Sequence, residues 1–433
     1  MLAFSKYMCY NAYKMKNVEL TADQERAKNL IAEWFFNGDQ LKFVLAGYAG
    51  TGKTFLINHV VKYTLGLKAG SEAAFVSPTG KAATVLAQGG TVAGTVHSLI
   101  YIRDEDDFDV NEDGEIVQSE RKLSFHKRES IDEKIRLIII DEASMISDSV
   151  LRDLLSYGVK CLFCGDRAQL PPVNGECQLL ENPDAELTEI VRQAKGDPII
   201  HVATMAREGK HIPYGNYGEN VSVIPLRRLQ GLERKRILLR ADQIICGRNK
   251  TRNSLNTEYR EYLGIPRDCL LPQDGEKLIC TLNNWEKPLD KSERFHLVNG
   301  VIGRAENVQE HYDYLLSLSF QADGIGGEIT AVADTGVFLT GEYAHLYGDQ
   351  AAKLVNGEIV HECNRTLLRK LKVTEMETIS RFEFAYAITC HKAQGSEFDS
   401  VVVFDESWLF GEDRFRWLYT AITRAKKRLL IVR

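Results

Sequence analysis

The sequence predicts an α/β protein whose sheets are mainly parallel and which carries smaller β-rich insertions. Three observations predict this fold class. Short apolar runs alternate with segments of helical periodicity, the order produced when helices connect parallel strands. A polar stretch at 103–133 and a strand-rich stretch at 315–381 interrupt the alternation. The length of 433 residues allows about three domains.

The expected helices and strands follow from the pattern of apolar residues. A helix is expected over 20–36, with Thr21 as its N-cap, and another over 53–65. Strands are expected where apolar runs are short and uninterrupted, namely over 41–46, 73–77, 137–140, 161–164, 400–404 and 429–432. Because ligands of parallel sheets bind beyond the carboxyl ends of the strands, the residues that follow these runs form the candidate site.

The two interruptions differ in character. The first is acidic between 104 and 120 and contains Asp113-Gly114, a dipeptide that favours a tight turn. A β-hairpin insertion is therefore expected there. The second consists of short strand patterns separated by glycine turns, so a small β domain is expected.

Composition narrows the class of protein only coarsely. A net charge of −6 neither indicates nor excludes a nucleic-acid partner, because the local field of a groove governs phosphate binding. No apolar stretch approaches the ~20 residues of a membrane span, and residues 1–17 lack the apolar run of a signal peptide. We therefore expect no membrane partner and a cytoplasmic location with reduced cysteines.

A phosphate-binding loop is the most specific signal in the chain. The segment from Gly47 to Thr54 fits G-x-x-x-x-G-K-[ST] and lies between an expected strand and an expected helix. Backbone N–H groups of such a loop wrap the β-phosphate, Lys53 supplies charge to the β- and γ-phosphate oxygens, and Thr54 offers a hydroxyl to Mg²⁺. The residues expected to bind ATP here are Gly47, Ala49, Gly50, Thr51, Gly52, Lys53 and Thr54.

An acidic pair, Asp141-Glu142, ends the apolar run at 137–140. A carboxylate at that strand end can hold Mg²⁺ opposite Thr54, directly or through water. The neighbouring Glu142 can orient and deprotonate the attacking water. Downstream of a phosphate-binding loop, this pair predicts hydrolysis of a nucleoside triphosphate.

Further segments resemble the motifs of superfamily 1 helicases. They are Leu20-Thr-x-x-Gln24 (Q motif), SPTGKAA at 77–83 (motif Ia), TVHSL at 95–99 (motif Ib), GDRAQLPPV at 165–173 (motif III), LTEIVRQ at 187–193 (first arginine finger), TCHKAQGSE at 389–397 (motif V) and YTAITRAK at 419–426 (motif VI). Their order, spacing and wording are similar to the 5′-to-3′ RecD/Dda-like branch over about residues 18–433.

The resemblance implies an architecture. It predicts two RecA-like P-loop domains, over 1–190 and 191–433, with the ATP site between them. It also predicts a small hairpin insertion at about 102–133 in the first domain and an SH3-like β insertion at about 310–380 in the second.

The resemblance also implies catalytic roles. Gln169 would bond the γ-phosphate or the attacking water, and the guanidinium groups of Arg192 and Arg424 would stabilise transition-state charge from across the cleft. Gln24 would read the adenine edge. Gly395 and Glu397 of motif V are further expected ATP-site residues, and ATP and Mg²⁺ are the expected cofactors.

In the family, motifs Ia, Ib and V line the single strand. Hydroxyl, imidazole and ammonium groups there can donate to phosphates or stack with bases. Asn299 begins an Asn-Gly-x-x-Gly segment similar to one in this branch, although an ordinary turn explains it equally well. The expected DNA contacts are Pro78, Thr79, Thr95, His97, Asn299, Thr389, His391 and Lys392.

The predicted function is an ATP-dependent DNA helicase that moves 5′ to 3′ on single-stranded DNA and unwinds forked duplex. Tyr101, Phe108 and Phe125 are candidate strand-separating wedges, with ordinary packing as the competing interpretation. A monomer is expected, with single-strand-binding or replication proteins as candidate partners. The alternatives are a translocase that does not unwind, an ATP-gated binding module, and an RNA-directed helicase.

Overall fold

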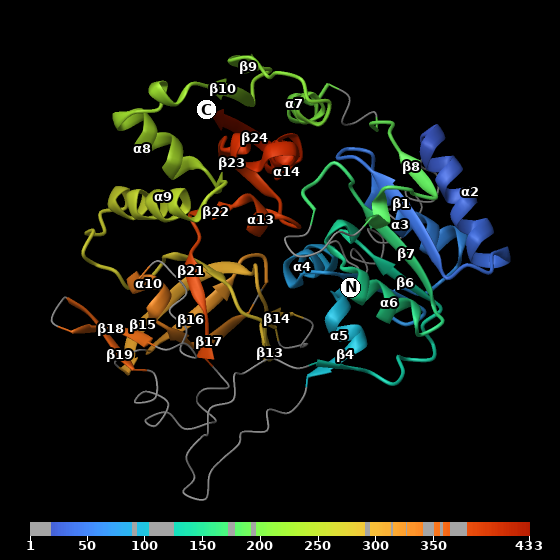
Figure 1. The fold of residues 1–433 in the computed structure, drawn as a ribbon, viewed down its shortest axis with the longest axis horizontal. Coiled ribbons are helices and arrows are strands. Elements are labelled where there is room, and N and C mark those ends of the chain that lie inside the picture. The colour runs from blue at the N-terminus through green and yellow to red at the C-terminus, as the bar shows by residue number, and fades with distance from the viewer. Residues whose placement is uncertain are drawn as a thin grey trace, which may run out of the picture.

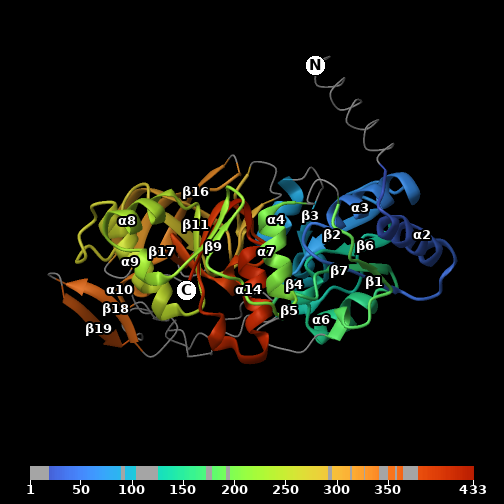
Figure 2. The same ribbon diagram turned by 90° about the horizontal axis from the view of Figure 1, so that it is seen from above.

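The computed structural model describes residues 19–88, 93–103, 125–171, 178–191, 196–290, 295–312, 315–325, 327–340, 350–355, 358–363 and 379–433. Two α/β lobes lie side by side, and a β-rich body adjoins the second (Figure 1). Seen from above, helices α7 (Pro198–Arg207) and α14 (Arg414–Ile422) lie on the side of the second lobe that faces the first (Figure 2).

The first lobe is built on a six-stranded sheet in which every pairing is parallel. Its strands, in spatial order, are β3 (Ala93–Thr95), β2 (Ala73–Ser77), β6 (Leu137–Ile140), β7 (Lys160–Gly165), β1 (Lys42–Gly47) and β8 (Ala185–Leu187). The helices of this lobe are α2 (Ala22–Asn37), α3 (Lys53–His59) with a π-helical turn at Val60–Thr64, α4 (Gly80–Gln88), α5 (Val96–Ile100) and α6 (Asp148–Leu155).

The strands predicted in this lobe are confirmed to within one residue, as is the helix that follows the phosphate-binding loop. Thr21 is the N-cap of α2 and forms a capping box with Gln24. The strand β6 is fully buried along its length, which explains why its sequence is an uninterrupted apolar run.

The second lobe is built on another six-stranded sheet, parallel except where β9 pairs with β10. Its order is β22 (Ala387–Thr389), β11 (Gln243–Cys246), β23 (Phe398–Phe404), β24 (Ala425–Val432), β10 (Val221–Ile224) and β9 (Gly215–Tyr217). Helices α7, α8 (Gly231–Arg240), α9 (Asn249–Tyr262), α13 (Cys390–Ala393) and α14 belong to this lobe. The predicted strands at 400–404 and 429–432 lie within β23 and β24.

The β-rich body contains a mainly antiparallel sheet that is wider than the predicted insertion at 310–380. Its strands are β20 (Ile379–Ser380), β17 (Glu328–Asp334), β16 (Leu315–Ala322), β15 (Ile302–Tyr312), β12 (Lys277–Cys280) and β21 (Phe382–Phe384). Smaller pairs join β13 (Asn284–Pro288) to β14 (His296–Leu297) and β18 (Gln350–Val355) to β19 (Glu358–Cys363), and α10 spans Gly336–Thr340. The sheet therefore begins about 30 residues before the predicted start.

The first insertion leaves the first lobe through an antiparallel pair, β4 (Tyr101–Arg103) with β5 (Phe125–Lys127). The Asp113-Gly114 turn predicted between these strands lies outside the described residues. Within the described part of the chain, no helix is long and apolar enough to cross a membrane.

Candidate nucleotide site and nucleic-acid cleft

The phosphate-binding loop joins β1 to α3, the position the sequence predicts for it. Gly50 and Gly52 have φ angles of 80° and 75°, a conformation that favours glycine. The Lys53 ammonium donates to the carbonyl oxygens of Gly47 at 2.7 Å and Tyr48 at 3.3 Å, so it spans the mouth of the loop. Thr51 Oγ1 donates to the same Tyr48 oxygen at 2.8 Å.

Gln24 packs directly on this loop. Its Nε2 donates to the Thr51 carbonyl at 2.9 Å, and its Oε1 accepts from the Thr21 N–H at 3.1 Å. A Cβ at Gly52 would approach Gln24 Nε2 to 2.8 Å. These contacts show that Gln24 positions the loop; its expected contact with the adenine edge stays a prediction.

The segment that carries the first predicted finger is tied to the same loop. Asp23 Oδ2 accepts from the Thr188 N–H and hydroxyl and from the Glu189 N–H, at 2.8–3.0 Å. Val191 N–H donates to the Gly50 carbonyl at 3.1 Å. Arg192 itself lies outside the described residues, but its immediate neighbour is held against the phosphate-binding loop.

The acidic pair lies at the end of β6, in the middle of the sheet. Asp141 Oδ1 accepts from the Glu142 N–H at 2.9 Å. Glu142 has a φ angle of 54°, a left-handed conformation that is strained for a residue with a side chain. Backbone strain of this kind is typical of functional sites.

Burial governs the protonation of both carboxyls. It raises the pKa of Glu142 to about 7. The charge of the Arg424 guanidinium lowers this pKa, and the charge of Asp141 raises it further. Burial also raises the pKa of Asp141, while the Glu142 N–H and the Lys53 charge lower it. A carboxyl with a pKa near 7 suits a general base that works at neutral pH.

Arg424 acts on this site from the second lobe, and Gln169 of the first lobe is buried. Arg424 is 4% exposed and donates to the carbonyl oxygens of Thr420 at 3.0 Å and Ser396 at 3.2 Å. Because its charge lowers the pKa of Glu142, the guanidinium lies within electrostatic range of the acidic pair. Gln169 is 8% exposed, and its Oε1 has no hydrogen-bond partner among the described residues.

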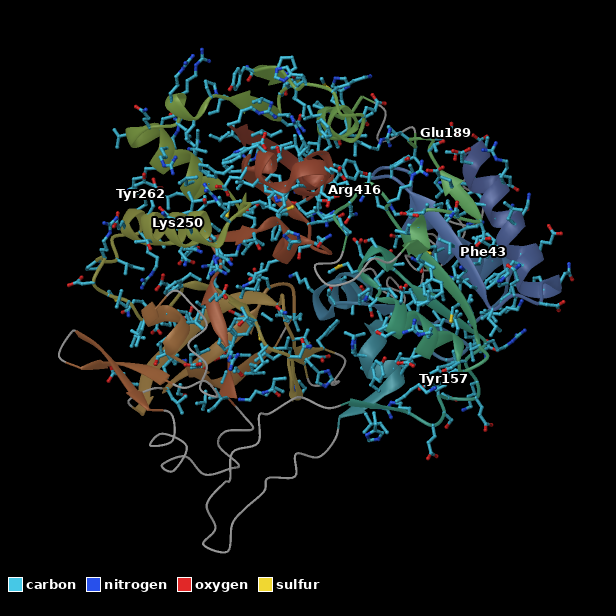
Figure 3. The ribbon with its side chains drawn as sticks, viewed as in Figure 1. Phe43, Tyr157, Glu189, Lys250, Tyr262 and Arg416 are labelled. Atoms are coloured by element: carbon cyan, nitrogen blue, oxygen red, sulfur yellow. The ribbon has the colours of Figure 1, made fainter. Side chains whose placement is uncertain are left out.

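A tyrosine of motif VI bridges the lobes at the phosphate-binding loop, and the sequence patterns did not reveal it. Tyr419 is 2% exposed; its hydroxyl donates to Asp166 Oδ2 at 2.6 Å and accepts from the Ala49 N–H at 2.8 Å. A second bridge places the Arg207 guanidinium 3.8 Å from the centre of the Tyr48 ring. Arg416 of α14 lies between the lobes near this stack (Figure 3).

The oxygen donors around the loop fit a small hard cation. Thr54 is exposed at the start of α3, and the Asp141 carboxyl lies at the end of β6, close enough to Lys53 for that charge to lower its pKa. Mg²⁺ is usually held by one or two protein oxygens together with phosphate oxygens and water. Thr54 and Asp141 are therefore the residues that would hold it.

A separate cleft of about 250 Å³ lies between the two lobes and the β-rich body. It is lined by seven of the eight residues predicted to contact DNA, namely Pro78, Thr79, Thr95, His97, Asn299, His391 and Lys392. Thr389, the eighth, is the N-cap residue of α13 and lies just behind the lining. Residues as far apart in the sequence as Pro78 and Gln394 thus form one surface.

The charge of this cleft is modest. Burial lowers the pKa of His97 and of His391, which favours neutral imidazoles that can stack or hydrogen-bond. The Lys392 ammonium lies 2.5 Å from Glu383 Oε2, and Arg252 pairs with the same carboxylate. Lys392 is therefore held by a buried carboxylate that it shares with Arg252, and the three groups together keep one net positive charge.

Lys81 is the cationic group of the lining that the predicted contacts omitted. Burial lowers its pKa, and its ammonium makes no hydrogen bond or ion pair within the described part of the chain. It stands in the SPTGKAA segment, so the motif itself carried the signal. Gly80 allows this segment to approach the β-rich body, since a Cβ there would lie 1.8 Å from Val298 Cγ2.

The remaining predicted site residues are placed as follows. Gly395 lies against Ala82 and Thr79 of the first lobe, on the side of the cleft, and Glu397 is exposed. The Tyr101 hydroxyl donates to Asp153 of α6, which anchors this candidate wedge to the first lobe. Phe108 and the side chain of Phe125 lie outside the described residues.

Two family models match different parts of the chain. A family model described as an AAA domain matches residues 19–223, and one described as a UvrD-like helicase C-terminal domain matches residues 384–432. The ATP-dependent RecD2 DNA helicase of Deinococcus radiodurans is 25% identical over 406 residues, which are 89% of this chain and 46% of that protein. The chain thus spans about half the length of that relative.

For two further proteins, the match covers most of both chains. The ATP-dependent DNA helicase Pif1 of Campylobacter jejuni is 24% identical over 88% of this chain and 86% of that protein. The crystal structure of Pif1 helicase from Candida albicans has a TM-score of 0.50 at 17% identity, covering 96% of this chain and 94% of that one. At this identity the structural likeness establishes the fold alone.

The two largely parallel sheets, with the phosphate-binding loop on the first and Arg424 on the second, define a P-loop protein with paired RecA-like lobes. Together with the family matches and the RecD2 and Pif1 relatives, they support a RecD/Pif1-like helicase of superfamily 1. The family resemblance predicted from the motifs is confirmed.

Proposed function

We propose that the chain is an ATP-driven motor that moves 5′ to 3′ on single-stranded DNA and unwinds forked duplex. One observation carries the proposal: the two lobes that share the nucleotide site also share the cleft lined by motifs Ia, Ib and V. A change in their separation at one site therefore alters the other. ATP supplies the hydrolysable phosphate bond, and Mg²⁺ neutralises its charge.

The chain's own groups have distinct tasks in hydrolysis. Lys53 and the loop N–H groups hold the phosphates, and Thr54 and Asp141 hold the metal. Glu142 orients a water and accepts its proton, which its pKa near 7 permits. Arg424, with Arg192 as the second proposed finger, stabilises the charge that develops on the γ-phosphate.

A chain of contacts connects the nucleotide site to the cleft. Gln394, which lines the cleft, donates from Nε2 to the Leu170 carbonyl at 3.0 Å. Leu170 follows Gln169 and donates its N–H to the Thr420 hydroxyl at 2.9 Å. Thr420 in turn accepts from Arg424. Through these contacts, nucleotide binding can change the affinity of the cleft for the strand. This requires that the nucleotide-bound and nucleotide-free states differ in the free energy of their contacts.

The test compares ATP hydrolysis in the presence of single-stranded DNA, single-stranded RNA and blunt duplex. We expect the largest stimulation by single-stranded DNA. Stimulation by RNA alone would point to an RNA-directed motor. If no strand stimulates hydrolysis, the proposal is refuted and an ATP-gated binding module becomes the better explanation.

Direction and unwinding need a second experiment. We expect a duplex with a 5′ single-stranded tail to be unwound and one with only a 3′ tail to persist. Movement along a single strand without unwinding would show that the protein is a translocase and not a helicase. Preferential unwinding from the 3′ tail would contradict the proposed direction.

A further inference from the structure

The second lobe exposes a large aromatic side chain near the cleft. Trp408 lies on the 3₁₀-helical segment η6 (Ser407–Asp413) and is 66% exposed. The neighbouring Leu409 is 38% exposed. Trp408 and Leu409 are adjacent, so together they form a small exposed apolar patch on this segment.

A fixed cation accompanies this ring. The Arg248 guanidinium lies 5.9 Å from the centre of the Trp408 ring. Glu406 holds it in place, accepting from Arg248 Nε at 2.8 Å as well as from the Gly247 and Arg248 N–H groups and the Thr251 hydroxyl. The Arg248 side chain nevertheless stays 51% exposed, so its charge is presented beside the indole.

The segment that carries Trp408 also contacts a residue of the cleft lining. His391, which lines the cleft, has its ring centre 5.9 Å from that of Phe410. Phe410 stacks on Trp417 at 5.5 Å and 19°, which fixes η6 against the core of the lobe. Trp408 is two residues from Phe410 on the same segment, so the exposed indole is carried by the segment that contacts the cleft lining through Phe410.

We propose that Trp408, Arg248 and Lys250 form a stacking platform for a base of the single strand where it leaves the cleft over the second lobe. The inference rests on the proposed function and extends its binding surface. Lys250 is exposed at the start of α9, where its ammonium can meet phosphate (Figure 3). An aromatic face flanked by cations suits an unpaired base and its backbone, whatever the base sequence.

A nucleic acid explains this surface better than a protein partner does. The Arg248 guanidinium beside the indole stays 51% exposed in its ion pair with Glu406, the exposed Lys250 follows two residues later at the start of α9, and Asp413 is paired with Arg416 at 3.3 Å. The platform is also continuous with a cleft whose lining is already that of a strand-binding groove.

The experiment measures the affinity of labelled oligothymidylates, from about 6 to about 16 nucleotides, by fluorescence anisotropy without nucleotide. In the parent protein we expect affinity to go on rising after the cleft is filled. Trp408→Ala should weaken the binding of the longest strand about 5- to 100-fold, the range for one stacked base, and leave the shortest strand unaffected. Trp408→Phe should retain most of the long-strand affinity.

Two more variants make the result specific. Lys250→Ala should lower the slope of log affinity against log salt by about 0.7 for the long strand only. Tyr214→Ala removes another exposed aromatic of the second lobe, 57% exposed and outside the cleft lining, and should change nothing.

The outcomes separate the platform from the motor. If short strands bind and stimulate ATP hydrolysis while Trp408→Ala matches the parent at every length, the platform is refuted and the indole is left for a protein partner. An equal loss at all lengths would also refute it. If no strand of any length binds, the proposed function fails first.

Discussion

Replacing Glu142 with Gln should stabilise the nucleotide-free protein at alkaline pH. Burial raises the pKa of Glu142 from 4.5 to about 7, so the folded state binds more protons than the unfolded state between these values. Stability is therefore lost as pH rises through this window, by about 1.4 kcal/mol per pH unit and roughly 3 kcal/mol in all. An amide carries no charge at any of these pH values and avoids the loss.

The assay is the melting temperature of parent and variant, without nucleotide, between pH 5 and pH 8. The variant's advantage should be small at pH 5 and grow to roughly 6–12 °C at pH 8 for a lobe of about 200 residues. Glu129→Gln, at an exposed glutamate, is the matched control and should show no growing difference. A constant difference between Glu142→Gln and the parent across this range would refute the argument that burial of this carboxyl is costly.

Four further predictions concern hydrolysis and the contacts between the lobes. Lys53→Ala should abolish ATP turnover, and near-normal turnover would contradict its role on the phosphates. Arg424→Ala should lower kcat by about 10³-fold or more while a fluorescent ATP analogue still binds; a rise in KM alone would make it a binding group. Tyr419→Phe leaves Asp166 without its hydroxyl donor, so thermal melts should show a loss of about 1–3 kcal/mol; unchanged melting would contradict the bridge. Gly80→Ala should weaken oligonucleotide binding measured by anisotropy but not ATP binding, because the new Cβ collides with Val298 and pushes the SPTGKAA segment away from the β-rich body. Unchanged oligonucleotide affinity would show that the close approach of these two parts is not needed for binding.

Local patterns determined what could be predicted from the sequence. The run at 137–140 is apolar because β6 is buried on both faces, and Thr21 was recognisable because capping depends on residues three positions apart. The phosphate-binding loop was predictable for the same reason, since its glycines and Lys53 act within eight consecutive residues. The acidic pair then followed from its place at the next strand end.

Contacts between distant segments could not be predicted in the same way. The run at 277–280 has the apolar character of a parallel strand, and only its antiparallel partners β15 and β21 assign it to the β-rich body. The Tyr419 bridge to Ala49 spans 370 positions and depends on how the lobes meet. The Glu383 carboxylate that pairs with Lys392 comes from that same β-rich body, so this partner of a motif V lysine could not be predicted from its motif alone.

The position of Arg424 gives the clearest physical reason for coupling between the two sites. Its guanidinium bonds Ser396 of motif V, which lies beside the cleft, while its charge acts on Glu142 at the nucleotide. Any shift of the guanidinium toward a γ-phosphate must therefore change its bond to motif V or move that loop. Gly395, with a Cβ position only 2.8 Å from Ala82, presses the same loop against motif Ia of the first lobe. A small displacement at Arg424 thus acts on both walls of the cleft at once.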